Sequence, residues 1–287
     1  MLYYLHIPKS AGISVRELFR RTYGEKLIEI YRDMDDAYAE SLKPVCHPDS
    51  VFFGHFGFSL HVRLGDNDAQ YMTVIRHPVE RVISWYKWVS RRPESAQYER
   101  IHRDGLTLAE AVQLGVSTEV NNHTVRMLAG NCLISQAKQR AMDYLSARLL
   151  RKEIYQYEGK RYLDTAIANL NNYFCFVGIM ERLDQLPRFL IERGDVAAEN
   201  ASVPMENVAP PMDVRIDSQT LDVIRKGNEL DLMLYEHIAG KIKRGEAWYP
   251  VKERSRSLVT RFHVARLGIA RPPNAGKVDR GSLRSGA

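Results

Sequence analysis

Short runs of apolar, β-forming residues alternate along this chain with longer stretches that have helical periodicity. The four clearest runs cover residues 2–7, 51–53, 72–75 and 174–179, and they are apolar at successive positions, as strands buried on both faces are. Helical patterns are found at residues 14–23, 78–90, 107–114, 119–128, 142–173, 184–192 and 218–243. Buried strands separated by helices predict the α/β class, with a central parallel sheet flanked by helices.

Composition and patterning predict one folded domain followed by a tail. The chain has 287 residues, of which 45% are hydrophobic and 26% charged, and these are the values of an ordinary domain with a buried core. We find no repeat and no clear linker in residues 1–250, although a proline-rich, irregular segment crosses them at 204–212. Periodic apolar positions stop there, so we expect residues 251–287 to form a disordered, basic C-terminal tail.

The positive net charge is concentrated in this tail. Lysine and arginine total 41 against 35 acidic residues, which gives a net charge of +6. Residues 252–287 carry +7 and the preceding 251 residues carry −1, so the charge of the folded part does not support a nucleic-acid-binding surface. Weak contact of the tail with anionic glycans or a membrane surface is one interpretation, and a plain disordered end is the simpler one.

Three widely separated cysteines, Cys46, Cys132 and Cys175, form neither a disulfide framework nor a metal-ligand motif. This spacing favours a reducing compartment, and we expect no metal site. No run approaches the roughly 18 apolar residues of a membrane span, and no leader precedes the first predicted strand. We therefore expect a cytoplasmic protein, whose oligomeric state the sequence leaves open.

The segment from His6 to Ser14, H-I-P-K-S-A-G-I-S, joins the first predicted strand to the first predicted helix. A glycine, a lysine and two hydroxyl side chains at a helix N-terminus are the parts of an anion site, because the N–H groups and dipole there favour negative charge. Ser14 and Glu17 have the spacing of a capping box, which predicts that the helix begins after the loop, near Ser14. In this interpretation Gly12 lets the backbone approach a ligand, and Lys9 supplies positive charge.

Two familiar nucleotide-binding patterns do not describe this loop. A Walker loop places its lysine after the glycines, whereas Lys9 precedes Gly12. The pattern G-x-G-x-x-G of dinucleotide-binding folds is absent from the sequence. A solvated lysine beside an ordinary helix start remains the simpler alternative for this motif taken alone.

A second motif lies at residues 72–86, M-T-V-I-R-H-P-V-E-R-V-I-S-W-Y. It places Arg76 at the carboxyl end of a predicted strand and Ser84 two turns into the next helix, and ligands bind at such strand ends in open α/β sheets. The guanidinium of Arg76 can hold a phosphate through two hydrogen bonds, and the Ser84 hydroxyl can add a third. The alternative is that Arg76 is a solvated strand end and Ser84 an ordinary helical serine.

Together the two motifs resemble those of the sulfotransferases that use 3′-phosphoadenosine 5′-phosphosulfate (PAPS), in particular the carbohydrate sulfotransferases that include the uronosyl 2-O-sulfotransferases. The 5′-phosphosulfate loop of that family looks like H-I-P-K-T-A-G-T-S. Its 3′-phosphate element looks like R-x-P-x-x-R-x-x-S, which is matched by Arg76, Pro78, Arg81 and Ser84. The resemblance extends over about residues 4–240. It implies a fold like that of P-loop NTPases, a sulfotransferase domain over residues 1–250, PAPS as donor, 3′-phosphoadenosine 5′-phosphate (PAP) as product, and no metal.

The resemblance also implies roles for the residues of both motifs. Arg76 and Ser84 would hold the 3′-phosphate, and Lys9 would also be catalytic, because its charge can stabilise the leaving phosphate. Ile13 and His77 depart from the family pattern, which commonly has a hydroxyl residue and Asp or Asn at these positions; Ile13 costs one possible hydrogen bond. The residues that would hold the 5′-phosphosulfate are Lys9, Ser10, Ala11, Gly12, Ile13 and Ser14.

An acceptor hydroxyl also needs a proton acceptor, and His55 follows a predicted strand and a glycine where the resembling 2-O-sulfotransferases have an active-site histidine. The alternatives are that His55 is a buried histidine bonded to backbone, or that His123 is the base. Asn122 and Arg126 lie four apart on a predicted helix, where they could contact acceptor or cofactor, or pack helices. Packing also explains the aromatic residues at 85, 86 and 88 better than sugar stacking does.

The sequence therefore predicts transfer of a sulfuryl group from PAPS to a hydroxyl of a carbohydrate or glycoconjugate acceptor. Two other classes remain open. A kinase-like phosphotransferase would need the Walker order and a magnesium-binding acid at a strand end, and the sequence displays neither. A non-catalytic module that binds PAP or another anion could use the same scaffold.

Overall fold

The computed structural model describes residues 1–31, 36–130, 153–203, 214 and 216–245. Several features expected from the sequence lie outside the described residues. These features are Cys132, the start of the helix predicted at 142–173, the irregular segment at 204–212 and the tail at 251–287.

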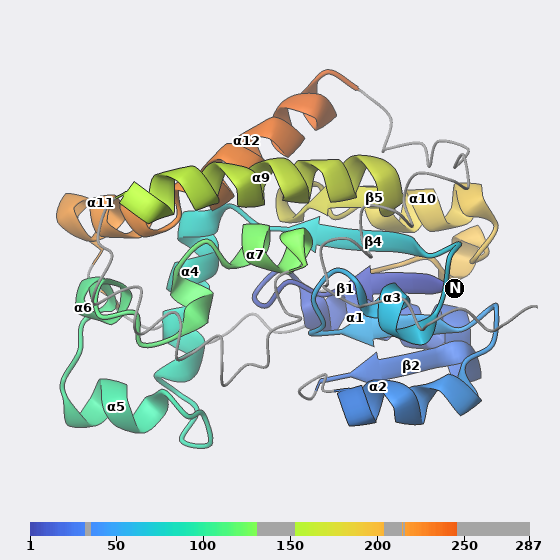
Figure 1. Cartoon of the computed structure of the whole chain (residues 1–287), viewed down its shortest axis with the longest axis horizontal. Coiled ribbons are helices and arrows are strands. Elements are labelled where there is room, and N and C mark those ends of the chain that lie inside the picture. Colours follow the sequence, from blue (N-terminus) through green and yellow to red (C-terminus); the bar gives the residue numbers. More distant parts are fainter. Residues whose placement is uncertain (32–35, 131–152, 204–213, 215, 246–287) are drawn as a thin grey trace, which may run out of the picture. The chain divides into compact units, whose positions relative to one another are not determined.

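Five parallel strands form one sheet in the order β2-β3-β1-β4-β5, and helices lie on both of its faces (Figure 1). The strands are β1 Leu2–Leu5, β2 Leu27–Ile30, β3 Val51–Gly54, β4 Gln70–Ile75 and β5 Phe174–Ile179. The predicted α/β class with a central parallel sheet is thus confirmed. Because β1 lies between β3 and β4, the carboxyl ends of these three strands come together at one edge of the sheet.

Strand β2 is the one strand of the sheet that the sequence did not predict. Its four residues read L-I-E-I, and only Ile30 among them is buried. The charged residue, Glu29, forms an ion pair with Arg20 of helix α1. A short, half-exposed edge strand that contains a charge lacks the continuous apolar run by which the other strands were found.

Helices α2, α3 and α5 were not predicted either, whereas the others overlap the expected ranges. The α-helices are α1 Gly12–Tyr23, α2 Asp36–Leu42, α3 Leu60–Leu64, α4 Pro78–Val89, α5 Tyr98–Arg103, α6 Leu108–Gln113, α7 His123–Ala129, α9 Glu153–Tyr173, α10 Gln185–Arg193, α11 Ser218–Gly227 and α12 Glu229–Lys243. The short 3₁₀ turns are η1 Gly24–Lys26, η2 Lys43–Val45, η3 Thr118–Val120, η5 Met180–Arg182 and η6 Ala198–Asn200.

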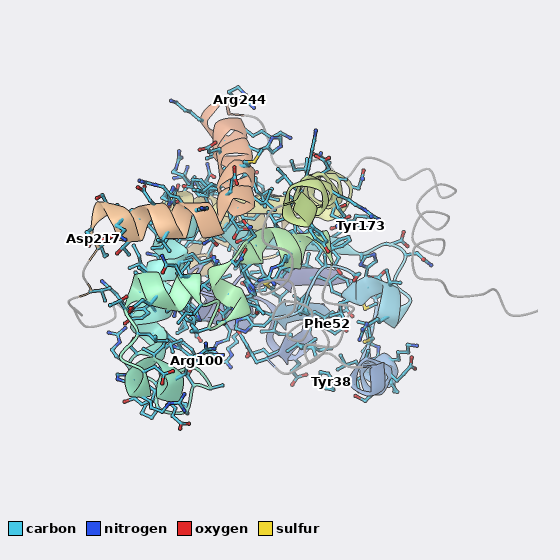
Figure 2. All side chains as sticks on the ribbon, turned by 60° about the vertical axis from the view of Figure 1, so that its left-hand side comes forward. Tyr38, Phe52, Arg100, Tyr173, Asp217 and Arg244 are labelled. Carbon is cyan, nitrogen blue, oxygen red and sulfur yellow. The ribbon has the colours of Figure 1, made fainter. Side chains whose placement is uncertain are left out.

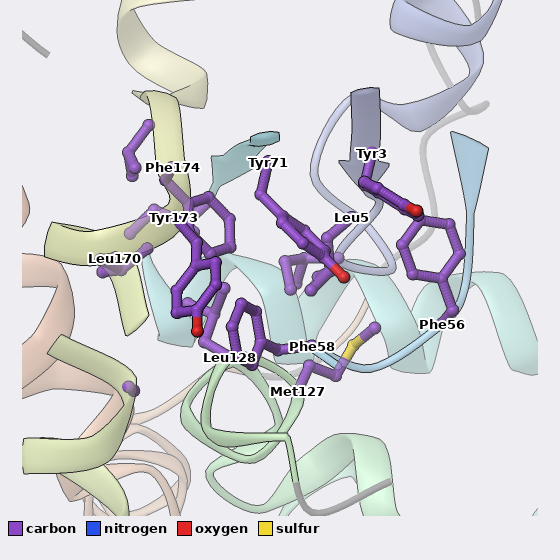
Figure 3. Close-up of a cluster of buried hydrophobic side chains, with 14 of the residues drawn as sticks. Tyr3, Leu5, Phe56, Phe58, Tyr71, Met127, Leu128, Leu170, Tyr173 and Phe174 are labelled. Atoms are coloured by element: carbon purple, nitrogen blue, oxygen red, sulfur yellow. The ribbon is translucent and has the colours of Figure 1, made fainter. Parts of the chain in front are cut away.

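Two apolar clusters hold the helices against the sheet. Successive side chains of β1 point to opposite faces, so Tyr3 packs in the cluster with α7, α9 and α12, and Tyr4 in the cluster with α1 and α10. Figure 3 shows the first cluster, where the ring of Tyr71 lies 4.8 Å from that of Tyr3 and 5.3 Å from that of Phe174. A third cluster joins α4, α6 and α11 beside the sheet.

The single long helix predicted at 218–243 is wrong, because α11 and α12 are separate helices that meet at Asn228. Figure 2 shows them at an angle, with Asp217 before the first and Arg244 after the second. Asn228 is fully buried, and its Nδ2 donates to the carbonyl oxygens of Val120 (2.9 Å) and Ile224 (3.0 Å). Its backbone is not helical, with φ −129° and ψ 32°, so the helix is interrupted there.

Candidate active site

The loop between β1 and α1 has an unusual backbone. Lys9 (φ 68°) and Ala11 (φ 60°) have left-handed conformations, and they are two of only four non-glycine residues with positive φ among those the structure describes. Such conformations are strained for residues with a side chain, and they persist where the surrounding structure fixes them. A left-handed residue next to a right-handed or turn residue makes successive N–H groups converge, which is how anion-binding nests are built.

Helix α1 begins at Gly12, two residues before the predicted start. Ala11 is its N-cap and makes no side-chain capping bond, so the predicted capping box of Ser14 and Glu17 is wrong. Ser14 lies in the first turn and is 8% exposed. The helix dipole and the first-turn N–H groups are therefore directed at the loop, and no side chain caps them at the N-cap position.

Gly12 is required by a protein neighbour. A Cβ atom at Gly12 would lie 1.7 Å from Nε2 of His6, so only glycine leaves room for the imidazole. This contact is a reason for glycine that the sequence did not suggest, and the approach of a ligand to the Gly12 backbone stays a prediction. Burial lowers the pKa of His6 well below its usual range, and the positive charges of Lys9 and Arg16 add to this, so His6 is a neutral ring that supports the loop.

Ser10 has a buried hydroxyl group that lacks a hydrogen bond. Its side chain is fully buried, and its Oγ has no hydrogen-bond partner within the described part of the chain. Buried polar groups are nearly always paired, since leaving one unpaired costs about 1–3 kcal/mol. Ser10 is not among the described residues that line the cavity discussed below, so its hydroxyl does not face that cavity, and its contact with the phosphosulfate stays a prediction of the resemblance.

Arg76 joins the second motif to the first. It follows β4 directly, and its Nη1 donates to the carbonyl oxygen of Lys9 at 3.4 Å across 67 residues of sequence. Its Nη2 lies 3.7 Å from a carboxylate oxygen of Glu80, in the first turn of α4. Burial lowers the pKa of Arg76, although Glu80 and Glu181 oppose this shift. The structure thus brings the two predicted motifs together at the ends of adjacent strands.

One cavity of about 870 Å³ contains side chains from both motifs. Arg76 and Ser84 line it together with the loop, and His55 enters it from the end of β3. A second wall comes from η5, α10 and the segment after η6, and it is mainly apolar. The residues of this second wall are Met180, Leu183, Asp184, Pro187, Arg188, Ile191, Ala201, Ser202 and Val203.

Lys9 lies against an aromatic ring in this cavity. Its Nζ is 5.1 Å from the ring centroid of Trp88, a cation–π distance. Burial lowers the pKa of Lys9 to about 8, while the nearby carboxylate of Glu119 opposes the shift. Trp88 is 37% exposed, so assigning it to packing was wrong, whereas Trp85 is 1% exposed and belongs to the core. The sequence could have placed Trp88 at the cavity, because Trp88 follows Ser84 by four residues and so lies on the same face of the helix.

His55 lines the cavity and remains accessible to solvent there. Its ring centroid lies 4.6 Å from that of His6 and 5.0 Å from that of Tyr31. Although part of the side chain is exposed, partial desolvation of the ring and the charge of Lys9 lower the pKa of His55 to about 4. At neutral pH the ring is therefore uncharged and able to accept a proton.

Glu119 is a cavity residue that the sequence did not suggest. It lies in η3 and lines the cavity. Burial raises its pKa, and the charges of Arg81 and Lys9 oppose that shift. In its carboxylate form it is thus a second group, besides His55, that could accept a proton near the loop. The prediction of one continuous helix over 119–128 hid this residue, because η3 ends before α7 begins.

Asn122, predicted to contact a substrate, lies in a buried helix junction. Its backbone is left-handed (φ 43°), and it separates η3 from α7. Its Oδ1 accepts hydrogen bonds from the N–H groups of Leu230 (3.0 Å) and Asp231 (3.2 Å). Arg126 donates to the backbone oxygens of Asn122 and Thr118. Neither Asn122 nor Arg126 is among the described residues that line the cavity, and their contacts explain them as parts of the scaffold.

Arg81, which matches the family motif, is part of the same scaffold and not of the cavity wall. Its side chain is fully buried, 3.7 Å from the carboxylate of Asp231 and 2.7 Å from the carbonyl oxygen of Glu119. His123, the alternative base, has its pKa lowered well below the usual range by burial and by the charges of Arg81 and Arg126. It too is absent from the cavity lining that the structure describes.

The parallel sheet and the cavity define an α/β protein in which the two predicted motifs meet at the carboxyl ends of the strands. The chain belongs to the sulfotransferase family, whose sequence model matches residues 1–237. This membership supports a transferase that moves sulfuryl groups, and the family generally uses PAPS. No curated protein matches the chain.

Two further observations concern the described residues alone. None of their helices is long and apolar enough to cross a membrane. Within the same ranges, no group of three or more histidine, cysteine or acidic side chains is arranged to hold a metal ion.

Proposed function

We propose that this protein transfers the sulfuryl group of PAPS to a hydroxyl of a carbohydrate or glycoconjugate. The observation that carries the proposal is the meeting of the two motifs, in which Arg76 bonds to the backbone of Lys9 at the edge of one cavity. A kinase-like activity has less support, because Lys9 precedes the loop glycine, whereas the lysine of a Walker loop follows the glycines. The carbohydrate branch and the domain boundary at residue 250 remain predictions.

The cavity residues suit PAPS by their charge and polarity. The loop residues from Lys9 to Ser14 would hold the 5′-phosphosulfate, where the left-handed backbone and the first turn of α1 offer N–H donors. Arg76 and Ser84 would hold the 3′-phosphate, and the apolar wall from η5 and α10 would cover the adenine ring. In this proposal the polar wall of the cavity binds the phosphate groups of the nucleotide and the apolar wall covers its adenine ring.

PAPS supplies an activated sulfuryl group whose departure leaves charge on the 5′-phosphate of PAP. Lys9 is placed to stabilise that charge, because a partly desolvated ammonium interacts more strongly than one in water. His55 would accept the proton of the acceptor hydroxyl, since its ring is uncharged at neutral pH and open to the cavity. Glu119 is a second candidate base, supported by its place in the same cavity and its raised pKa.

The acceptor would enter beside His55. Tyr31 is 43% exposed, lines the cavity and contacts His55 edge to face. An exposed aromatic ring next to the proposed base offers an apolar surface against which a sugar ring can pack.

The two described cysteines, Cys46 and Cys175, are free thiols, which is compatible with our proposal of a cytoplasmic location.

PAP is expected to stabilise the protein more than ADP does, because only PAP has a 3′-phosphate for Arg76 and Ser84. At about one hundred times its dissociation constant, PAP should raise the unfolding midpoint by roughly 5–10 °C. The measurement is thermal unfolding with matched concentrations of PAP, ADP and ATP. Arg76→Gln should remove the preference for PAP, and equal stabilisation of the wild type by PAP and ADP would contradict the assignment of the donor.

Ile13→Thr is expected to lower the KM for PAPS about threefold to tenfold. Ile13 is 42% exposed and lines the cavity, so a hydroxyl there can add one hydrogen bond worth about 1 kcal/mol. Ile13→Val is the matched control, because valine has the shape of threonine without the hydroxyl. Equal KM values for the two variants would show that position 13 contacts no phosphosulfate oxygen.

A further inference from the structure

Trp88 is the aromatic residue whose ring lies against Lys9, the residue assigned above to the leaving phosphate. It lies in the last turn of α4, and its indole ring lines the cavity. The ammonium of Lys9 lies over this ring at 5.1 Å, and the guanidinium of Arg92 lies over the same ring at 5.9 Å. The ring face carries partial negative charge, so it attracts both cations.

The charges around Lys9 leave its protonation sensitive to its neighbours. Burial lowers the pKa of Lys9 to about 8, which is close enough to physiological pH that a fraction of the side chain is uncharged. Glu119 favours the ammonium, and most of the other charged groups near it oppose the ammonium. The cations that oppose it are Arg76, Arg91 and Arg92, and the imidazoles that lie close enough to respond to its charge are His6 and His55.

We propose that Trp88 is a positioning residue for Lys9, which holds the ammonium against its indole face at the cavity wall and favours the charged form of the side chain. The inference rests on the proposed function, because Lys9 is the residue assigned there to the leaving phosphate. Of the two protonation states of Lys9, only the ammonium is attracted to the ring, so the ring stabilises the charged state and one position of Nζ. Without the ring, the carboxyl group of Glu119 would have to counter the charges of three neighbouring arginines. The pKa of Glu119 is itself raised, which favours its uncharged form.

The comparison with Trp85 separates this role from packing. Trp85 belongs to the same helix but is 1% exposed and packs in the cluster formed with α6 and α11. Trp88 is excluded from that cluster and contacts cations instead. The contact with Lys9, whose backbone is left-handed, therefore explains the exposed Trp88 ring, and core packing does not.

The test compares Trp88→Leu, which removes the aromatic face, with Trp88→Phe, which keeps a weaker one. The pKa of Lys9 is measured by NMR titration of isotope-labelled lysine, with Lys9→Arg used to assign the signal. We expect Trp88→Leu to lower this pKa by about 0.5–1 unit and Trp88→Phe to lower it by less. The alkaline limb of kcat/KM for labelled sulfate transfer should move by the same amount, and kcat at pH 8 should fall about twofold to fivefold in the leucine variant, because the charged fraction of Lys9 falls by that factor.

Arg92→Gln is the control with the opposite sign. It removes a cation from the same ring, so it should raise the pKa of Lys9 and move the alkaline limb to higher pH. An unchanged Lys9 pKa in Trp88→Leu, or a faster turnover than in the wild type, would overturn the inference. If the wild type shows neither sulfate transfer nor a preference for PAP, the proposed function fails, and the NMR titration still decides whether Trp88 controls Lys9.

Discussion

Lys9→Ala is expected to lower kcat for sulfuryl transfer by about 10³-fold, the scale on which removal of one preorganised electrostatic donor acts. Lys9 is the only lysine among the described residues that line the cavity. Its ammonium is partly desolvated, and it belongs to the loop assigned to the 5′-phosphosulfate. The measurement is the rate of labelled sulfate transfer from PAPS at saturating donor, on an acceptor found by screening polysaccharides, glycolipids and small alcohols.

Two controls make the loss at Lys9 interpretable. Thermal stabilisation by PAP should persist in reduced form in Lys9→Ala, because Arg76 and Ser84 still face the cavity. Lys9→Arg keeps the charge and should retain more activity than alanine, although a planar guanidinium does not replace a compact ammonium fully. A kcat for Lys9→Ala within threefold of the wild type would remove this residue from the mechanism.

The sheet and both motifs could be predicted from the sequence because each rests on local information. The runs that became β1, β3, β4 and β5 are continuously apolar, and a strand buried on both faces leaves that signature regardless of its neighbours. The order of lysine and glycine in the loop, and the spacing of Arg76 and Ser84, are equally local. The two motifs lie close together because each follows a strand, and the carboxyl ends of parallel strands lie at the same edge of the sheet.

The features that the sequence did not predict depend on tertiary contacts. Asn228 divides the last helix because its amide bonds to Val120, a residue far away in the chain. Asn122 has the spacing of a helical partner for Arg126, yet its side chain is bound to the start of α12. Glu119 enters the cavity only because η3 and α7 are separate. Helical periodicity cannot reveal such breaks, since they are caused by partners elsewhere in the fold.

His55→Ala is expected to lower kcat by about 10²–10³-fold, the range of general base catalysis. A base must be unprotonated to act, and the pKa of His55 is lowered to about 4. The kcat/KM of the wild type should therefore persist as the pH falls through 6.5, where an ordinary histidine would be half protonated, and decline only as the pH approaches 4. The measurement is a pH profile of labelled sulfate transfer, restricted to pH values at which thermal unfolding shows a folded protein.

Glu119→Gln distinguishes the two candidate bases. If His55 is the base, the glutamine variant should keep the acid limb of the wild type near pH 4, since the titrating imidazole is still present. If Glu119 is the base, its raised pKa places the acid limb above the ordinary value for glutamate, and Glu119→Gln should lose the activity that His55→Ala retains. A kcat for His55→Ala near that of the wild type between pH 6 and 8 would disqualify the histidine. Because His55 packs against His6 and Tyr31, His55→Asn serves as the variant of similar shape that separates loss of the base from disturbance of the loop.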